Sequence, residues 1–156
     1  MPNHHHQNRG GHRPQQQNRQ QRRSLGFTIQ FRNEEGKIDA DLFDKTAQRA
    51  AEIIANKSDR RASGMNKSTQ LRRFYDELVM WEEKARQNED KFDEYLPFVR
   101  MLKAKAAYAE GRKLVDGAFV ELMEQTINWV KSADDLRVAK LFFEAFLGFY
   151  KLEKGD

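Results

Sequence analysis

The sequence contains no cysteine, and its four histidines all lie at or before residue 12. The absence of cysteine excludes a disulfide framework and a thiolate zinc site. The absence of histidine from the rest of the chain removes the usual activation of a serine nucleophile there. A Gly-rich phosphate loop of the Walker type is also missing. These absences predict a protein that is not an enzyme and that uses no cofactor and no catalytic residue.

The acidic pairs of the sequence do not change this expectation. Glu82 and Glu83 are neighbours in sequence, as are Asp134 and Asp135. On a helix such neighbours point about 100° apart, so they do not converge on one metal ion. We interpret them as solvated surface charge. We interpret the histidine triplet at residues 4–6 as part of a polar tail, so the sequence predicts no metal site.

Long hydrophobic segments are also missing from the sequence. It contains no apolar run of about 18 residues, the length that suggests a transmembrane helix. The N-terminus lacks the apolar stretch of a signal peptide. We therefore expect a cytoplasmic protein that has no membrane partner.

Residues 1–24 are a low-complexity run of Gln, Asn, Arg, His and Gly in which Met1 is the one hydrophobic residue. A segment with nothing to bury gains no free energy from ordering, so we predict a disordered tail. Residues 1–26 contain five arginines and no acid, which suggests a loose, salt-sensitive grip on RNA or DNA. Deletion of residues 1–24 is expected to leave the fold intact.

Residues 25–38 differ from both the tail and the rest of the chain. Apolar side chains occur at every second position from Leu25 to Phe31, which predicts an extended segment. Residues 33–36 then read as a turn. A single extended segment needs a partner, so it packs either on its own domain or on another subunit.

From Asp39 onward, apolar residues recur at the spacing of three and four that marks one face of a helix. The sequence therefore predicts an all-α domain over residues 39–156, a compact bundle of about five helices. Residues 56–67 and 88–93 are expected to connect helices. The predicted helices are one that is capped by Asp39 or Asp41, one over residues 68–86, one that holds Pro97 in its first turn and ends near Gly111, one over residues 117–131, and one that starts after Ser132.

Two of these helices carry specific packing predictions. In the third, Phe98 is expected on the buried side together with Val99 and Leu102. The last helix is apolar on most sides, which fits either the centre of the bundle or a face reserved for a partner, and the first is favoured. Ser132 with Asp135 three residues later resembles a capping box.

Charge is segregated along the chain. Residues 57–75 carry a net charge of +5, residues 76–94 carry −5, and residues 95–115 carry +4. This pattern predicts polar surfaces of opposite sign on the folded domain. The start of the second helix combines free N–H groups with nearby cations, an arrangement that suits a phosphate. We expect no array of exposed aromatic rings, so the basic residues indicate backbone contact rather than base recognition.

Three segments together resemble a known family. They are residues 68–78 (STQLRRFYDEL), residues 96–112 (LPFVRMLKAKAAYAEGR) and residues 140–151 (KLFFEAFLGFYK). Their order and spacing are similar to the small subunit of the Csm complex, the type III-A CRISPR effector. The resemblance covers residues 65–152 and leaves the tail and the extended segment outside it.

The resemblance implies a small α-helical bundle that is not catalytic. Its partners would be the CRISPR guide RNA and target RNA, the backbone and large subunits of the Csm complex, and neighbouring copies of itself. RNA cleavage would belong to the backbone subunits, and DNA cleavage and cyclic-nucleotide synthesis to the large subunit. The residues that it places near RNA phosphates are Lys67, Gln70, Arg72, Arg73, Arg100, Lys103, Lys105 and Arg112.

Alternative roles stay open for these residues and for the chain. Arg100 and Arg112 would instead form salt bridges with the acids of residues 76–94, and a structural role is favoured for Glu110 and Arg112. The chain would otherwise be an independent DNA-binding module, although a connection as long as residues 56–67 does not suit a helix-turn-helix. A protein-interaction subunit that touches no nucleic acid is the third interpretation.

Overall fold

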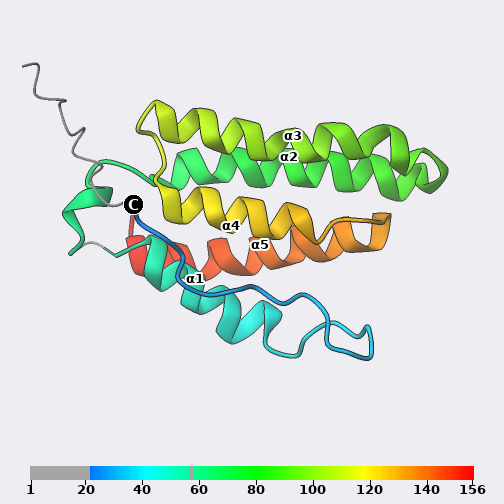
Figure 1. The fold of residues 1–156 in the computed structure, drawn as a ribbon, viewed down its shortest axis with the longest axis horizontal. Helices are drawn as coiled ribbons and strands as arrows, with labels where there is room; N and C mark the ends of the chain where they lie inside the picture. Colours follow the sequence, from blue (N-terminus) through cyan, green and yellow to red (C-terminus); the bar gives the residue numbers. More distant parts are fainter. Residues whose placement is uncertain (1–21, 57) are drawn as a thin grey trace, which may run out of the picture.

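A computed structural model describes residues 22–56 and 58–156 (Figure 1). The expectations for residues 1–21, including the histidine triplet, lie outside these residues. The described part confirms the predicted all-α bundle: it has no strand, and its one β-bridge joins Arg32 to Ile38. The helices are η1 (Leu42–Thr46), α1 (Ala47–Ile54), η2 (Arg60–Ala62), α2 (Ser68–Gln87), η3 (Glu89–Lys91), α3 (Phe92–Gly111), α4 (Gly117–Asn128) and α5 (Ala133–Lys154).

Two antiparallel hairpins make up most of the bundle, α2 with α3 and α4 with α5 (Figure 1). Helix α5 packs against both α1 and α2, and α4 packs against α3. The apolar character of α5 therefore reflects its central position, because Phe142, Phe143, Phe146 and Tyr150 are all fully buried. The rings of Phe119 and Phe143 meet edge to face at 6.2 Å between centroids and join α4 to α5. Within the described residues, no helix is long and apolar enough to cross a membrane.

Caps set the boundaries of the second hairpin. The Ser132 hydroxyl accepts a hydrogen bond from the Asp135 N–H at 3.1 Å, as predicted for the start of α5. The Asp135 carboxylate, however, accepts from the Lys131 N–H and so departs from a strict capping box. At the start of α4, Asp116 accepts from the Phe119 N–H at 3.3 Å.

Pro97 lies in the interior of α3, so the prediction that it occupies the first turn of this helix is wrong. Helix α3 begins five residues earlier, at Phe92, directly after the short turn η3. Residues 88–93 are predicted to be a polar connector, but Phe92 is buried in the core and anchors the new helix start. An interior proline removes one backbone hydrogen bond, and here the missing bond is the one to the Asp93 carbonyl.

The segment of residues 22–31, which we call the strap, is extended and lies along α4 on the side of α1 (Figure 1). Leu25, Ile29 and Phe31 are buried in the core, with at most 1% of each exposed. The strap therefore packs on its own domain. Its alternation buries every second side chain, except that Phe27 is only partly covered and has the Arg49 guanidinium 4.3 Å from its ring centroid.

Side chains of α4 take the place of a partner strand for the strap. The Gln125 amide accepts from the Ile29 N–H at 2.6 Å and donates to the Phe27 carbonyl at 3.0 Å. The Trp129 indole N–H donates to the Ile29 carbonyl at 3.0 Å. These hydrogen bonds pair backbone groups of the strap that a neighbouring strand would pair in a β-sheet. An extended segment is thus accommodated without a partner strand among the described residues.

The start of the strap corrects the boundary predicted for the tail. Residues 22–24 are predicted to belong to the disordered segment, but Arg22 and Arg23 both pair with carboxylates of the bundle. Their backbone approaches Gly117 so closely that a Cβ there would lie 2.6 Å from the Arg23 carbonyl oxygen. Composition describes this stretch correctly as polar, but it does not show that one of its arginines has a buried partner.

Candidate nucleic-acid interface

Four of the eight basic and polar residues predicted to contact RNA line one groove between α2 and α3. Gln70 and Arg73 come from α2, and Lys105 and Arg112 come from α3 or directly follow it. The groove has a volume of about 220 Å³. Its remaining lining comes from Phe74, Glu77, Tyr108, Ala109 and Leu114.

One of the cations in this groove is already paired. Lys105 contacts both carboxylate oxygens of Glu77, at 2.8 and 2.9 Å, and this ion pair links α3 to α2. Among residues 22–56 and 58–156, Arg100 and Arg112 make no ion pair, so the predicted bridges from them to the acids of residues 76–94 are wrong. The groove keeps uncompensated positive charge, which suits a phosphate.

Tyr108 lies beside these cations and is strongly exposed. Its relative exposure is 68%, and the Arg112 guanidinium carbon lies 5.8 Å from its ring centroid. At this distance a cation interacts favourably with the face of an aromatic ring. The groove therefore combines an accessible ring with a guanidinium, a combination that the sequence patterns do not predict.

The other four predicted residues lie elsewhere on the surface. Lys67 is exposed directly before α2. Arg72 lines a different hollow, between α2 and the end of α5, and pairs with Asp76 at 3.3 Å. Lys103 donates to the Asn128 amide oxygen at 2.7 Å and so leans towards α4. Arg100, one turn earlier on α3, is exposed near the same edge.

The phosphate site predicted at the start of α2 already has a carboxylate in it. The Ser68 N–H donates to the Asp156 carboxylate at 3.2 Å, and the Ser68 hydroxyl contacts the same carboxylate. A carboxylate from the end of the chain therefore already occupies this helix terminus. The cations of the groove remain the better candidates for contact with phosphates.

Two aromatic side chains of α3 are nevertheless exposed, Tyr108 and Phe98, which lie ten residues apart in the sequence. Phe98, predicted to be buried, is 53% exposed, and it stacks on Trp81 with the ring centroids 5.3 Å apart. The sequence does hold a signal for this surface, since Phe98, Met101 and Tyr108 recur at helical spacing on a second stripe of α3. This exposed stripe also contains Lys105 and Arg112, and it lies next to the stripe of α3 that is buried in the core.

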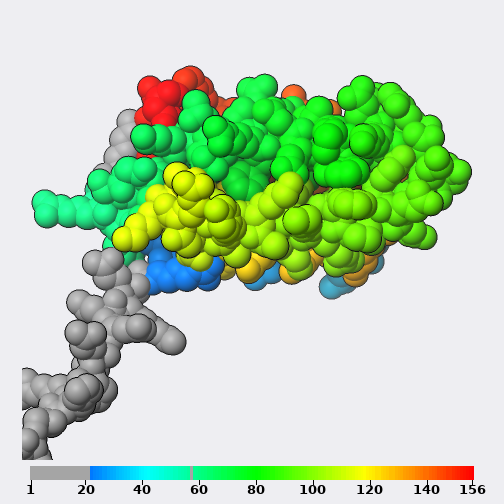
Figure 2. All heavy atoms as spheres, turned by 90° about the horizontal axis from the view of Figure 1, so that it is seen from above, coloured from blue at the N-terminus to red at the C-terminus, as the bar shows by residue number. Residues whose placement is uncertain are grey.

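Charge is separated between the two ends of the α2–α3 hairpin. The loop that precedes α2 and the turn that follows α3 share one end of the molecule, while the connection between the two helices forms the other (Figure 2). The basic stretch of residues 57–75 therefore meets Arg112 and Lys113, whereas most of the acidic residues between 76 and 94 lie towards the opposite end. The predicted surfaces of opposite sign are the two ends of one hairpin.

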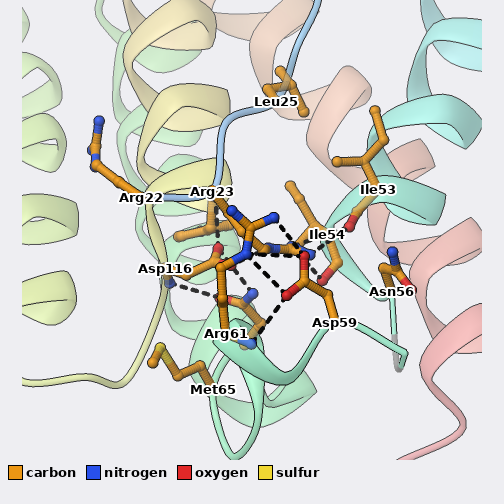
Figure 3. Close-up of polar contacts among 12 residues, drawn as sticks. Arg22, Arg23, Leu25, Ile53, Ile54, Asn56, Asp59, Arg61, Met65 and Asp116 are labelled. Atoms are coloured by element: carbon orange, nitrogen blue, oxygen red, sulfur yellow. Dashed lines mark hydrogen bonds and ion pairs between the residues drawn. The ribbon is translucent and has the colours of Figure 1, made fainter. Parts of the chain in front are cut away.

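A buried polar cluster holds the basic end together (Figure 3). Arg23 pairs with Asp116 at 2.6 Å and donates to the Ile53 and Ile54 carbonyls at the end of α1, at 3.0 and 3.2 Å. The Asn66 amide donates to Asp116 at 3.0 Å, and the buried Tyr150 hydroxyl donates to the Asn66 carbonyl. We call Arg23, Asn66, Asp116 and Tyr150 the latch.

Two exposed ion pairs surround the latch. Arg22 pairs with Glu110 at 2.8 Å, so Glu110 has the structural role favoured for it, but with a partner that the sequence does not indicate. In the loop before α2, the hydrogen bonds of Arg61 lower the pKa of Asp59 to about 2. Part of the positive charge of residues 57–75 is therefore paired locally with this carboxylate.

Other acidic groups of the described residues also have structural partners. Asp134 and Asp135 converge on the Arg32 guanidinium, at 2.8 and 2.9 Å, and so are not simply solvated. The hydrogen bond from Arg32 and the one from Arg137 lower the pKa of Asp134. Among residues 22–56 and 58–156, no group of acidic side chains is arranged to hold a metal ion.

Comparison with known proteins gives one match. The sequence model of a family described as Csm2 Type III-A matches residues 39–156, which is well over half of the chain. The match begins after the strap and includes both helical hairpins and the groove between α2 and α3. No curated protein and no solved structure matches this sequence.

Proposed function

Because the chain belongs to the Csm2 family and is thus a small subunit of the type III-A Csm complex, we propose that it braces the guide RNA and target RNA through backbone contacts, without catalysis of its own. Its partners are then the backbone and large subunits of the complex, neighbouring copies of itself and the two RNAs. Such a complex would act in antiviral defence in the cytoplasm.

The groove between α2 and α3 is the observation that carries this proposal. Arg73 and Arg112 enter it from opposite sides, and Glu77, the acid that lines it, is paired with Lys105. Guanidinium groups bind phosphate oxygens through paired hydrogen bonds, and such contacts do not depend on base sequence. A subunit repeated along an RNA of any sequence needs contacts of this kind.

We expect the double variant R73Q/R112Q to weaken retention of target RNA by the reconstituted complex, most strongly at low salt. Removal of each phosphate contact should reduce the slope of log affinity against log salt by about 0.7 to 0.9. The matched control is R137Q, which removes an exposed arginine that pairs with Asp134 on α5. Equal salt dependence for R73Q/R112Q and the unchanged protein would contradict the proposal.

The alternative interpretations give different results with the same complex. If the chain were only a protein-interaction subunit, charge reversal at Arg73 and Lys103 would leave RNA retention unchanged. If it were a DNA-binding module, duplex DNA would compete for it more strongly than RNA. The connection between α1 and α2 contains η2 and is longer than a helix-turn-helix turn, which counts against a helix-turn-helix DNA-binding module.

The arginines of residues 1–21 are proposed to add a second, looser grip on RNA. The strap enters the bundle at Arg22, whose pair with Glu110 places it next to the basic end. Removal of residues 1–21 is expected to lower affinity for RNA at low salt and to have little effect at high salt. Filter binding over a salt series measures this, and unchanged affinity at low salt would show that the tail makes no contact.

A further inference from the structure

We propose that Tyr108 is a stacking platform for one unpaired RNA base, next to the phosphate contacts made by Arg73 and Arg112. The proposal rests on the RNA-bracing function and adds a base contact to it. Backbone contacts alone hold a strand but do not fix where each base lies. An aromatic ring that lines the groove would fix the position of one base, whichever base it is.

The exposure of Tyr108 is the first observation that supports this platform. The residue is 68% exposed, on a helix whose other side packs against α4 and α2. Phe98, on the same stripe of α3, is covered on one face by Trp81, with an angle of 13° between the rings. The ring of Tyr108 instead has a cation beside it, the Arg112 guanidinium, at 5.8 Å from the centroid.

The charge around the ring selects the kind of partner. Arg73, Lys105 and Arg112 line the same groove as the ring, and Glu77 in that groove is paired with Lys105. An apolar protein surface would have to desolvate these cations on docking, which costs free energy. A nucleotide satisfies both parts of the site, because its phosphate takes the guanidinium groups and its base presents a π-face.

The groove also offers a group that suits ribose. Gln70 lines it beside Arg73, and its side-chain amide can both donate and accept hydrogen bonds. A 2′-hydroxyl is likewise both donor and acceptor, and this group distinguishes RNA from DNA. Phosphate, ribose and base would thus each meet a different side chain of the same groove.

The proposal is tested with the full-length chain and two labelled oligouridine RNAs, one intact and one in which the bases are removed and the phosphates kept. Affinities are measured by fluorescence anisotropy at low salt. We expect Y108L to lose about tenfold in affinity for the intact RNA, the scale of one base–aromatic stack. Y108F keeps the ring and is expected to bind as the unchanged chain does. F98L, which alters an exposed ring at the other end of the same stripe, is the matched control.

The outcomes separate this proposal from the function on which it rests. Stacking is supported if Y108L weakens binding while Y108F and F98L do not, and if the unchanged chain binds RNA without bases about as weakly as Y108L binds the intact RNA. Stacking is overturned, and backbone contact stands, if both RNAs bind equally well and only R73Q/R112Q is weakened. If the unchanged chain binds neither RNA, both ideas fail. If Y108L binds RNA normally but enters the assembled complex poorly, the ring is a protein contact and the stacking proposal is wrong.

Discussion

Replacement of Arg23 by alanine is expected to lower the free energy of unfolding by about 3–5 kcal/mol, the usual cost of removing one partner of a buried ion pair. The side chains of Arg23 and Asp116 are only 4% and 7% exposed. Without the guanidinium, the Asp116 carboxylate would stay buried with its negative charge uncompensated. The carbonyls of Ile53 and Ile54 would lose their donor as well.

The position of Asp116 enlarges this effect. Its carboxylate caps α4 through the Phe119 N–H and accepts from the Asn66 amide, so movement of the group would disturb both contacts. Asn66 adopts a left-handed backbone conformation, with φ of 57°, in a fully buried site. Loss of Arg23 is therefore expected to loosen the loop before α2 as well as the strap.

Urea denaturation followed by circular dichroism measures this prediction. The matched control is R22A, because Arg22 is adjacent in sequence and also pairs with a carboxylate, but its side chain is 53% exposed. An exposed pair contributes about 0–1 kcal/mol. Equal loss of stability in the two variants would show that burial of the Arg23 pair does not matter.

Truncation tests the same ion pair without a substitution. Composition alone predicts that deletion of residues 1–24 leaves the fold intact. The structure changes this expectation, because that deletion removes Arg23, whereas deletion of residues 1–21 retains it. Of the two deletions, the shorter one is expected to preserve full stability.

Replacement of Phe31 by alanine is expected to destabilise the protein by about 3–5 kcal/mol, the range for large aromatic side chains removed from a core. Phe31 lies at the end of the strap and is 1% exposed. Its ring stacks on Trp129 at 5.5 Å between centroids and tilts against Phe142 at 5.7 Å. The substitution would leave a cavity between the strap, α4 and α5, lined by rings that cannot easily close it.

The same denaturation experiment measures this change, and T28A is its control. Thr28 lies on the same strap but is exposed, so its loss should change stability by no more than about 0.5 kcal/mol. If F31A were as stable as T28A, the strap would not be part of the folded core.

The predictions for the site show where sequence patterns are informative. Helical periodicity predicts polar edges on α2 and α3, and the family resemblance placed Gln70, Arg73, Lys105 and Arg112 among the candidates. Periodicity could not show that these four meet in one groove, because the rotation of one helix against the other decides which edges face each other. For the same reason, periodicity could not distinguish these four residues from Arg72, which faces α5.

The sequence by itself determined the helical class, the approximate helices, the extended strap and the segregation of charge. Each of these depends on local spacing and composition, which do not require knowledge of distant contacts. Only the tertiary structure decided that Arg23 is buried with Asp116, that Tyr108 is exposed and that Asp156 occupies the start of α2. These features join residues far apart in the chain, and an arginine, a tyrosine or an aspartate has the same local signature whether its partner is water or a side chain brought close by folding.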